Sequence, residues 1–333
     1  MTRARTLFAP LALALLMLAW TAPSVAQRAS TRVGSGRARR IVMEPGQAYV
    51  LQEDGVLVAW TSDAERVPSY RFSGGPVPGA TGLVDFCGTF GVQADGAVGE
   101  MFSNGSYRPG TQAVGARSCG YRLLEHTLCF LDGQGAVRCR YDRDGEPVVV
   151  PGIRGATRVD VGDGVCALVG DHVTCWTSTS APRVLVSDVT TFSRYAGSGC
   201  GIQPDGELVC WASRNQRRPF DLSFAESQAR CRAATTDEER DYECVQRDTD
   251  AQPPSPVGIH DAVDVTIASH TGVVIRRDGR VLAWGQHPGF WNHDDAVAEV
   301  PWLRGARHVE IGRSAVCAIL ADGHAACWSR TRP

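Results

Sequence analysis

The sequence has no lysine and no excess of basic charge. Its 34 basic residues, all arginine, face 36 acidic residues, which gives a formal net charge of −2 at pH 7. Nucleic-acid-binding domains usually carry a concentrated basic patch, so this balance argues against nucleic acid as a partner. A nucleophile elbow and a glycine-rich phosphate loop are also missing, and the eight histidines are scattered. We therefore predict no catalytic residues and no cofactor.

Long apolar runs are scarce as well. One covers residues 7–20, after Arg3 and Arg5 and before the small-residue pattern Ser24-Val25-Ala26. This arrangement is typical of a secretory signal peptide, here residues 1–26. A membrane anchor is the alternative, but fourteen residues are fewer than the roughly 20 that span a bilayer. We expect a secreted or periplasmic protein without a membrane span, and a net charge of −4 for residues 27–333.

All twelve cysteines lie beyond the predicted signal peptide. An even number of cysteines in a chain bound for an oxidising compartment predicts disulfide bonds. The 36 glycines and 18 prolines indicate many turns, and 43% hydrophobic residues suffice for a large core. Residues 27–333 are therefore expected to form one turn-rich, disulfide-bonded domain.

A short pattern recurs seven times along the chain. It has alternating apolar residues on both sides of a glycine-containing turn, as in C-A-I-L-A-D-G-H-A-A-C-W at 317–328. Asp-Gly between such segments predicts a β-hairpin, because both residues tolerate the positive φ of tight hairpin turns. The turn glycines are Gly55, Gly96, Gly135, Gly170, Gly206, Gly279 and Gly323. They lie about 35–45 residues apart, except across one wider gap after Gly206.

The two positions that face each other across a hairpin are either both cysteine or both another residue. A cross-strand disulfide explains this rule, since directly opposed residues lie within disulfide reach. The predicted hairpin disulfides are Cys129–Cys139, Cys166–Cys175, Cys200–Cys210 and Cys317–Cys327. The other three hairpins carry Tyr49/Ala59, Phe90/Glu100 and Val273/Ala283. Zinc is the alternative, but the cysteines lack the close spacing of zinc ligands.

The wide gap between repeats holds an insertion at about 213–257. Its composition favours a helical hairpin, with Thr236 as N-cap and acidic residues in the first turn. Cys231 and Cys244 lie within it and are predicted to pair, so that subtraction leaves Cys87–Cys119 as the sixth bond. The insertion is either a partner-specific arm or a decoration that covers a blade edge.

The repeat length predicts the architecture. A hairpin cannot bury its apolar face alone, so a repeat of this size implies stacked or radial assembly. Further apolar segments, such as 184–192 and 298–311, supply two more strands per unit. Seven units of four strands predict an all-β fold, a seven-bladed β-propeller. We expect residues about 28–40 to complete the last blade and close the ring.

The repeat resembles a known family. The stretch V-V-I-R-R-D-G-R-V-L-A-W-G-Q at 273–286 is similar to the regulator of chromosome condensation repeat, and the resemblance covers nearly all of residues 30–330. The family's Gly-Gln-Leu-Gly stretch is reduced here to Gly285-Gln286. The resemblance implies a propeller. Family members include nuclear exchange factors, chromatin binders and secreted bacterial proteins, among them β-lactamase inhibitors, and the predicted signal peptide favours the secreted group.

Function is expected in the varied loops opposite the Asp-Gly turns, because variable loops on a rigid scaffold usually carry binding. Large aromatic residues are enriched in binding hot spots, and they are the candidate partner-binding residues here. The candidates are Tyr107, Tyr141, Phe290 and Trp291. For Phe290 and Trp291, the opposing interpretation is that they fold back onto their own blade.

Two short clusters contain residue types that bind metals. His287, His293, Asp294 and Asp295 form one, but no ligand geometry can be argued for them. The stretch Asp142-x-Asp144-Gly145 lacks the distal glutamate of a full calcium loop. We predict no metal site.

These observations favour a monomeric, non-enzymatic module that binds a protein partner, as an inhibitor or a surface interaction module. One alternative is a propeller enzyme or glycan-binding protein that acts at the mouth of the central channel. The other is a wall-associated structural module without a tight ligand.

Overall fold

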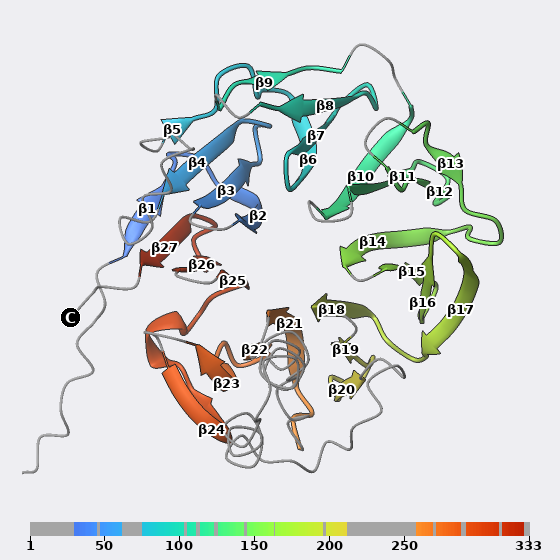
Figure 1. Ribbon diagram of the computed structural model, residues 1–333. Coiled ribbons are helices and arrows are strands. Elements are labelled where there is room, and N and C mark those ends of the chain that lie inside the picture. Colours follow the sequence, from blue (N-terminus) through green and yellow to red (C-terminus); the bar gives the residue numbers. More distant parts are fainter. Residues whose placement is uncertain are drawn as a thin grey trace, which may run out of the picture.

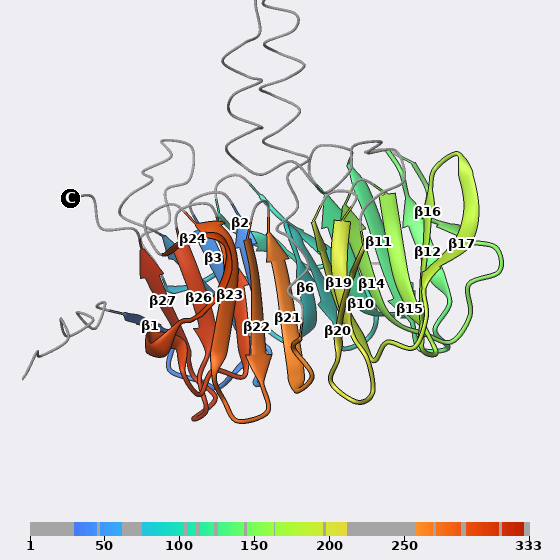
Figure 2. The same ribbon diagram turned by 90° about the horizontal axis from the view of Figure 1, so that it is seen from below.

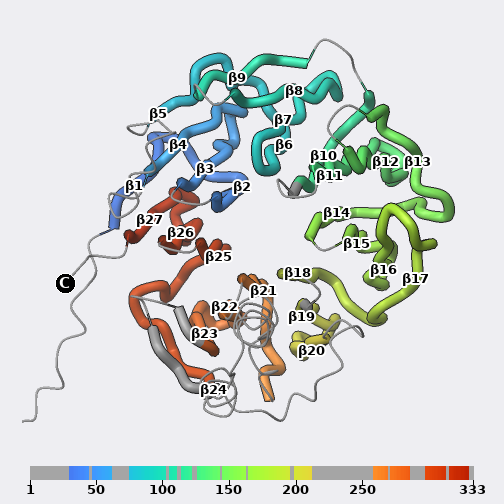
Figure 3. Tube along the Cα trace, in the orientation of Figure 1, coloured from blue at the N-terminus to red at the C-terminus, as the bar shows by residue number. Residues whose placement is uncertain are grey.

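The computed structural model describes residues 30–44, 47–61, 75–102, 105–110, 114–122, 126–142, 145–162, 164–195, 198–211, 258–268, 271–287, 291–312 and 315–329. These residues form seven antiparallel sheets that surround one axis (Figure 1). Successive sheets take successive places around the ring, as the colours of the Cα trace show (Figure 3). The protein is a seven-bladed β-propeller, as the repeat predicts.

Each blade begins at the axis and builds outward, strand by strand. Blade 1 contains β2 (Ala38–Glu44), β3 (Gln47–Gln52), β4 (Leu57–Thr61) and β5 (Gly75–Pro76). Blade 2 contains β6 (Leu83–Cys87), β7 (Phe90–Gln93), β8 (Val98–Met101) and β9 (Tyr107–Arg108). Blade 3 contains β10 (Ala116–Arg122), β11 (Thr127–Asp132), β12 (Val137–Arg140) and β13 (Val148–Val149). Blade 4 contains β14 (Ala156–Gly162), β15 (Gly164–Val169), β16 (His172–Thr177) and β17 (Ser180–Val186).

The remaining blades follow the same order. The described strands of blade 5 are β18 (Thr191–Tyr195), β19 (Ser198–Ile202) and β20 (Leu208–Trp211). Blade 6 contains β21 (Ala262–Ala268), β22 (Thr271–Arg276), β23 (Val281–His287) and β24 (Trp291–Glu299). After the short 3-10 helix η2 (Pro301–Leu303), blade 7 contains β25 (His308–Ile311), β26 (Ala315–Ile319), β27 (Ala325–Ser329) and β1 (Thr31–Val33).

The hairpins turn at the predicted glycines. Gly55 and Gly323, for example, have φ of +80° and +86°, a backbone conformation that glycine adopts without steric cost. The aspartate before the glycine accepts a hydrogen bond from the backbone N–H two residues after it, as between Asp54 Oδ1 and Val56 N at 3.1 Å. Side-chain bonds of this kind stabilise a turn locally, which explains why the short Asp-Gly signal locates the hairpins.

The hairpin register places the cysteines opposite each other. Four disulfides cross the hairpins of blades 3, 4, 5 and 7, with Cα–Cα distances of 4.0–4.1 Å. A fifth, Cys87–Cys119, joins blades 2 and 3. These five bonds are the pairs expected from the sequence, and they involve every cysteine in the described part of the chain. The predicted pair Cys231–Cys244 lies outside the described residues.

The ring closes through one short strand from the start of the described chain. Thr31–Val33 pairs with β27, with Val33 opposite Ala325, and so completes blade 7 beside blade 1. The structure narrows the predicted closing segment of 28–40, because Ala38 already begins the innermost strand of blade 1. Gly34 lies between these two strands, and its φ of +76° allows the chain to turn there.

The apolar core lies between adjacent blades. Leu51 and Leu57 of blade 1, for example, share one buried cluster with Leu83 and Phe86 of blade 2. Each sheet therefore buries its faces against its neighbours, and the stability of a blade depends on the blades beside it. The predicted signal peptide at 1–26 and the predicted helical insertion at 213–257 fall outside the described residues.

Candidate binding face and inter-blade pocket

The two ends of the ring carry different connections (Figure 2). We call one end the turn face; it is formed by the hairpin turns at 53–56, 94–97, 133–136, 170–171, 204–207, 277–280 and 321–324. The opposite end is the loop face. Its described residues are 88–89, 102, 105–106, 126, 141–142, 145–147 and 177–180. The described parts of the loops opposite the Asp-Gly turns therefore lie at one end of the propeller.

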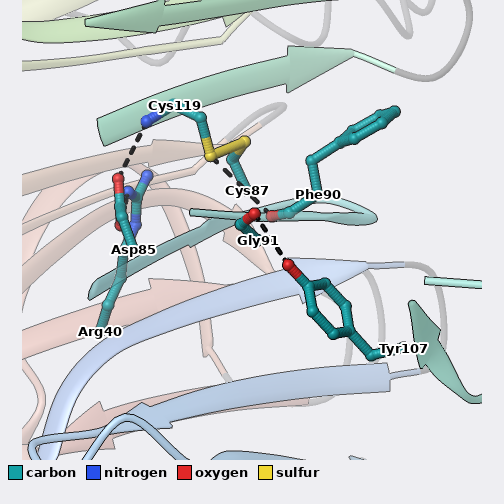
Figure 4. The surroundings of a disulfide bond; sticks show 7 residues. All are labelled: Arg40, Asp85, Cys87, Phe90, Gly91, Tyr107 and Cys119. Carbon is teal, nitrogen blue, oxygen red and sulfur yellow. Dashed lines mark hydrogen bonds and ion pairs between the residues drawn. A yellow bond between two sulfur atoms is a disulfide. The ribbon is translucent and has the colours of Figure 1, made fainter. Parts of the chain in front are cut away.

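A disulfide links the innermost strands of blades 2 and 3. The Cα atoms of Cys87 and Cys119 lie 5.8 Å apart (Figure 4). Beside this bond, Asp85 accepts a hydrogen bond of 3.0 Å from the backbone N–H of Cys119 and forms an ion pair with Arg40 of blade 1. One carboxylate and one disulfide thus connect three consecutive blades at the inner edge of the ring.

A second polar link joins blades 6 and 7. Nδ1 of His308 lies 2.7 Å from Asp264 Oδ2, and its Nε2 lies 3.0 Å from Glu310 Oε1. Burial by itself lowers the pKa of an imidazole, but the hydrogen bonds with the two carboxylates outweigh it and raise the pKa of His308 to about 10. The ring is therefore a cation at neutral pH. Both of its nitrogens are engaged, so it is suited to structure rather than to proton transfer.

A pocket of about 200 Å³ opens between blades 2 and 3 at the loop face. The lining side chains come from the strand ends and connections of these two blades. They are Thr89, Phe90, Glu100, Met101, Tyr121, His126 and Arg140. Two of them, Phe90 and Glu100, face each other across the blade 2 hairpin, at the positions where four other blades have a disulfide. The pocket therefore lies beside a hairpin that has no disulfide of its own.

Aromatic and charged contacts hold the pocket walls. The rings of Phe90 and Tyr121 pack edge to face at a centroid distance of 4.8 Å, and the Arg140 guanidinium lies 5.5 Å from the Phe90 centroid. Burial, together with the negative charges of Glu100 and Glu44, raises the pKa of Tyr121, which keeps its hydroxyl protonated. Burial also raises the pKa of Glu44 to about 7, so the carboxyl is partly protonated at neutral pH.

The structure corrects the expectation that Tyr107 lies at the binding surface. Its side chain is only 5% exposed, and its hydroxyl donates a 2.9 Å hydrogen bond to the carbonyl of Gly91. A Cβ atom at Gly91 would lie 2.8 Å from this hydroxyl, so the glycine makes room for the tyrosine. Burial raises the pKa of Tyr107 to about 12. Tyr107 is a core residue between blades 1 and 2, because Gly91 and Gly99 on the neighbouring strands leave room for its ring.

The other three aromatic candidates have different places. Tyr141 lies on the loop face and is partly exposed, and its hydroxyl accepts a 2.9 Å hydrogen bond from Trp176 Nε1 of blade 4. Trp291 begins the outermost strand of blade 6, but its side chain and the whole of Phe290 lie outside the described residues.

The pocket between blades 2 and 3 was not predicted from the sequence. Three hairpins lack the cysteine pair, and Glu100 is the only charged residue at their facing positions; that charge was the signal that could have located the pocket.

Of the histidine and aspartate residues in the two clusters noted in the sequence, only Asp142 has a described side chain. Asp142 is exposed on the loop face, whereas Asp144 and the side chains of His287, His293, Asp294 and Asp295 lie outside the described residues. Across the described ranges, no group of three or more His, Cys, Asp or Glu side chains is placed to hold a metal ion.

Comparison with known proteins identifies a fold but no family. No family model matches the chain. No curated protein matches it either. Among solved structures, it is similar to U3-55K at 11% identity and a TM-score of 0.58, covering 92% of this chain and 100% of that chain. At this level of sequence identity, the likeness establishes only that the chain has a propeller fold.

Two further propeller structures come from proteins whose binding to other proteins or peptides was studied. Prp20p from Saccharomyces cerevisiae, a yeast RCC1 protein, matches at 11% identity and a TM-score of 0.52, covering 88% of this chain and 82% of that chain. YCF48, solved with a bound peptide, matches at 9% identity and a TM-score of 0.55, covering 93% of this chain and 98% of that chain.

Within the described part of the chain, no helix has the length and apolar character needed to cross a bilayer.

Proposed function

We propose that this chain is a secreted or periplasmic propeller that binds a protein partner through its loop face and catalyses no reaction. The observation that supports this proposal most directly is the cross-linked ring. Five disulfides and the inter-blade links at Asp85 and His308 hold the scaffold rigid, while its varied connections gather at one end. A rigid frame lowers the entropy cost of binding, because the strands from which the binding residues project are already fixed in place.

The disulfide bonds support the proposed secreted or periplasmic location. Disulfides persist in extracellular and periplasmic environments and are rare in reducing ones. Five are formed in the described residues, and residues 1–26 have the sequence of a signal peptide.

The likenesses to solved propellers support a protein partner. The Prp20 structures describe binding to Gsp1p and histones and a complex with Kap60, and the YCF48 structure contains a peptide. The likeness to Prp20 and the repeat at 273–286 support placing this chain among proteins with regulator of chromosome condensation repeats, and the predicted signal peptide favours their secreted members.

The inner strands favour binding over catalysis at the channel mouth. Three of their acidic side chains are engaged by cations: Asp85 pairs with Arg40, and Asp264 and Glu310 both pair with His308. Groups engaged in this way serve as links between blades rather than as free acids, bases or sugar ligands.

The proposal is tested by charge substitutions on the two faces. Glu146→Arg and Thr179→Arg place a bulky cation on the loop face, whereas Ala94→Arg and Gln134→Arg place it on the turn face; all four side chains are exposed. The immobilised protein captures its partner from the secreted fraction of the source cells, and mass spectrometry quantifies the captured protein. We expect the loop-face variants to lose capture about tenfold or more, and the turn-face variants to retain it. Equal capture by all four variants would contradict the loop-face assignment.

A further inference from the structure

We propose that the pocket between blades 2 and 3 is a specificity pocket that accepts the phenol side chain of a tyrosine from the protein partner. This inference rests on the proposed function, because the pocket opens on the loop face, where the partner is proposed to bind. The ligand class follows from the size, the charges and the rigidity of the pocket.

The size of the pocket suits one side chain. Its volume is about 200 Å³, whereas pockets that enclose drug-sized ligands span roughly 300–1,000 Å³. Phe90 and Met101 contribute apolar surface to its walls, against which a ring can pack. An aromatic ring with a polar tip is the usual anchor of a protein interface, since it buries a large area and still satisfies one hydrogen bond.

The charges of the pocket select a neutral hydroxyl. Glu100 and Arg140 both line it, and no ion pair joins these two described residues. The Nε atom of Arg140 is buried and has no hydrogen-bond partner in the described structure. A carboxylate ligand would be attracted by Arg140 but repelled by Glu100, and an ammonium ligand would be attracted by Glu100 but repelled by Arg140, so neither charge suits both groups. A phenol hydroxyl satisfies both groups, because it can donate to the carboxylate and accept from the guanidinium.

The walls of the pocket are fixed before any ligand arrives. The Cys87–Cys119 disulfide joins the two blades that form them, and Figure 4 shows the bond directly beside Phe90. The contacts of Phe90 with Tyr121 and Arg140 hold its ring from the blade 3 side. A preformed pocket binds without an ordering cost, so even a single side chain can contribute to specificity.

Small probes test this selectivity on the full-length protein. Saturation-transfer NMR titrations compare p-cresol, which is the tyrosine side chain, with toluene, 4-methylbenzoate, 4-methylbenzylammonium and methyl α-glucoside. We expect p-cresol to bind with a Kd on the order of 1 mM and the other four probes at least about fivefold more weakly. Glu100→Gln and Arg140→Gln should each weaken p-cresol by about tenfold. The matched changes Glu299→Gln and Arg154→Gln, both exposed and distant from the pocket, should leave its Kd unchanged.

Each outcome decides the inference. Binding of p-cresol no tighter than toluene, or tighter binding of a charged probe or of the glucoside, would overturn it. Glu100 is exposed, so Glu100→Gln keeps the test valid even if Arg140→Gln fails to fold. Partner capture separates the two proposals: if p-cresol does not bind while the loop-face variants still lose their partner, only the pocket assignment falls. If the loop-face variants also keep their partner, the proposed function falls with it.

Discussion

Single charged side chains hold neighbouring blades together at the inner edge of this ring. Asp85 reaches both Arg40 and the backbone of Cys119, and His308 reaches Asp264 and Glu310. These pairs are partly buried, and breaking such a pair leaves the other charge with less solvation than in water and without its partner. Each of these side chains is therefore expected to influence the stability of the whole propeller.

The His308 link predicts a pH dependence of stability. Its pKa of about 10 lies above the ordinary imidazole value of 6.5, so protonation favours the folded state. The contribution is therefore complete below pH 6.5 and is lost as the pH rises through about 10. We expect His308→Gln to lower the free energy of unfolding by roughly 1–3 kcal/mol at pH 6, and this difference from wild type to shrink towards pH 10.

Urea denaturation at a series of pH values measures the difference. His172→Gln is the matched control, since His172 also lies close to an aspartate, at 3.2 Å from Asp171, but 46% of its side chain is exposed. An exposed pair of this kind contributes little. A constant difference between wild type and His308→Gln from pH 6 to pH 10 would rule out the charged link.

At the scale of elements, the disulfides fall into two kinds. Those within hairpins close loops with sequence separations of 9–10 residues, whereas Cys87–Cys119 spans 32 residues and two blades. A cross-link removes more entropy from the unfolded chain when its loop is longer. The chain-entropy relation gives about 3 kcal/mol for a hairpin bond and about 4 kcal/mol for the inter-blade bond.

We therefore expect the double variant Cys87→Ser/Cys119→Ser to lose more stability than Cys317→Ser/Cys327→Ser, by about 1 kcal/mol. Urea denaturation of both variants in non-reducing buffer gives the comparison, and intact-mass analysis verifies that the other bonds remain formed. A larger loss in the hairpin variant would show that local strand pairing, rather than loop closure, governs the effect.

At the scale of the whole molecule, one three-residue strand closes the ring. Val33 of β1 is 3% exposed and packs with residues of blades 7 and 1, so it lies at the joint between the two ends of the described chain. Because every blade buries its faces against its neighbours, weakening this joint should destabilise all blades together.

Val33→Ala is expected to lower the free energy of unfolding by roughly 1–3 kcal/mol while unfolding remains one transition. Tryptophan fluorescence and far-UV circular dichroism, followed against urea, should shift together. Val263→Ala is the control; Val263 is 48% exposed, and a surface change of this kind stays within about 0.5 kcal/mol. An early, separate transition in Val33→Ala would show that blade 7 opens independently.

Much of the fold could be predicted from local patterns, whereas much of the site could not. The Asp-Gly turns and the paired cysteines located the hairpins and their register, because both signals act between residues close in sequence. Tyr107 was misplaced, because its burial depends on the glycines of two neighbouring strands. The pocket was missed, since Glu100 and Arg140 belong to different repeats and meet only when two blades pack.

Local sequence patterns specify the strands, the turns and the partners of the hairpin cysteines, since turn chemistry and alternating side chains operate over a few residues. The contacts between side chains of different blades depend instead on the folded ring, as Arg40 meets Asp85 and His308 meets Asp264. The physical reason is that the radial packing of seven sheets sets these distances, and that packing depends on the shape of every interface around the ring.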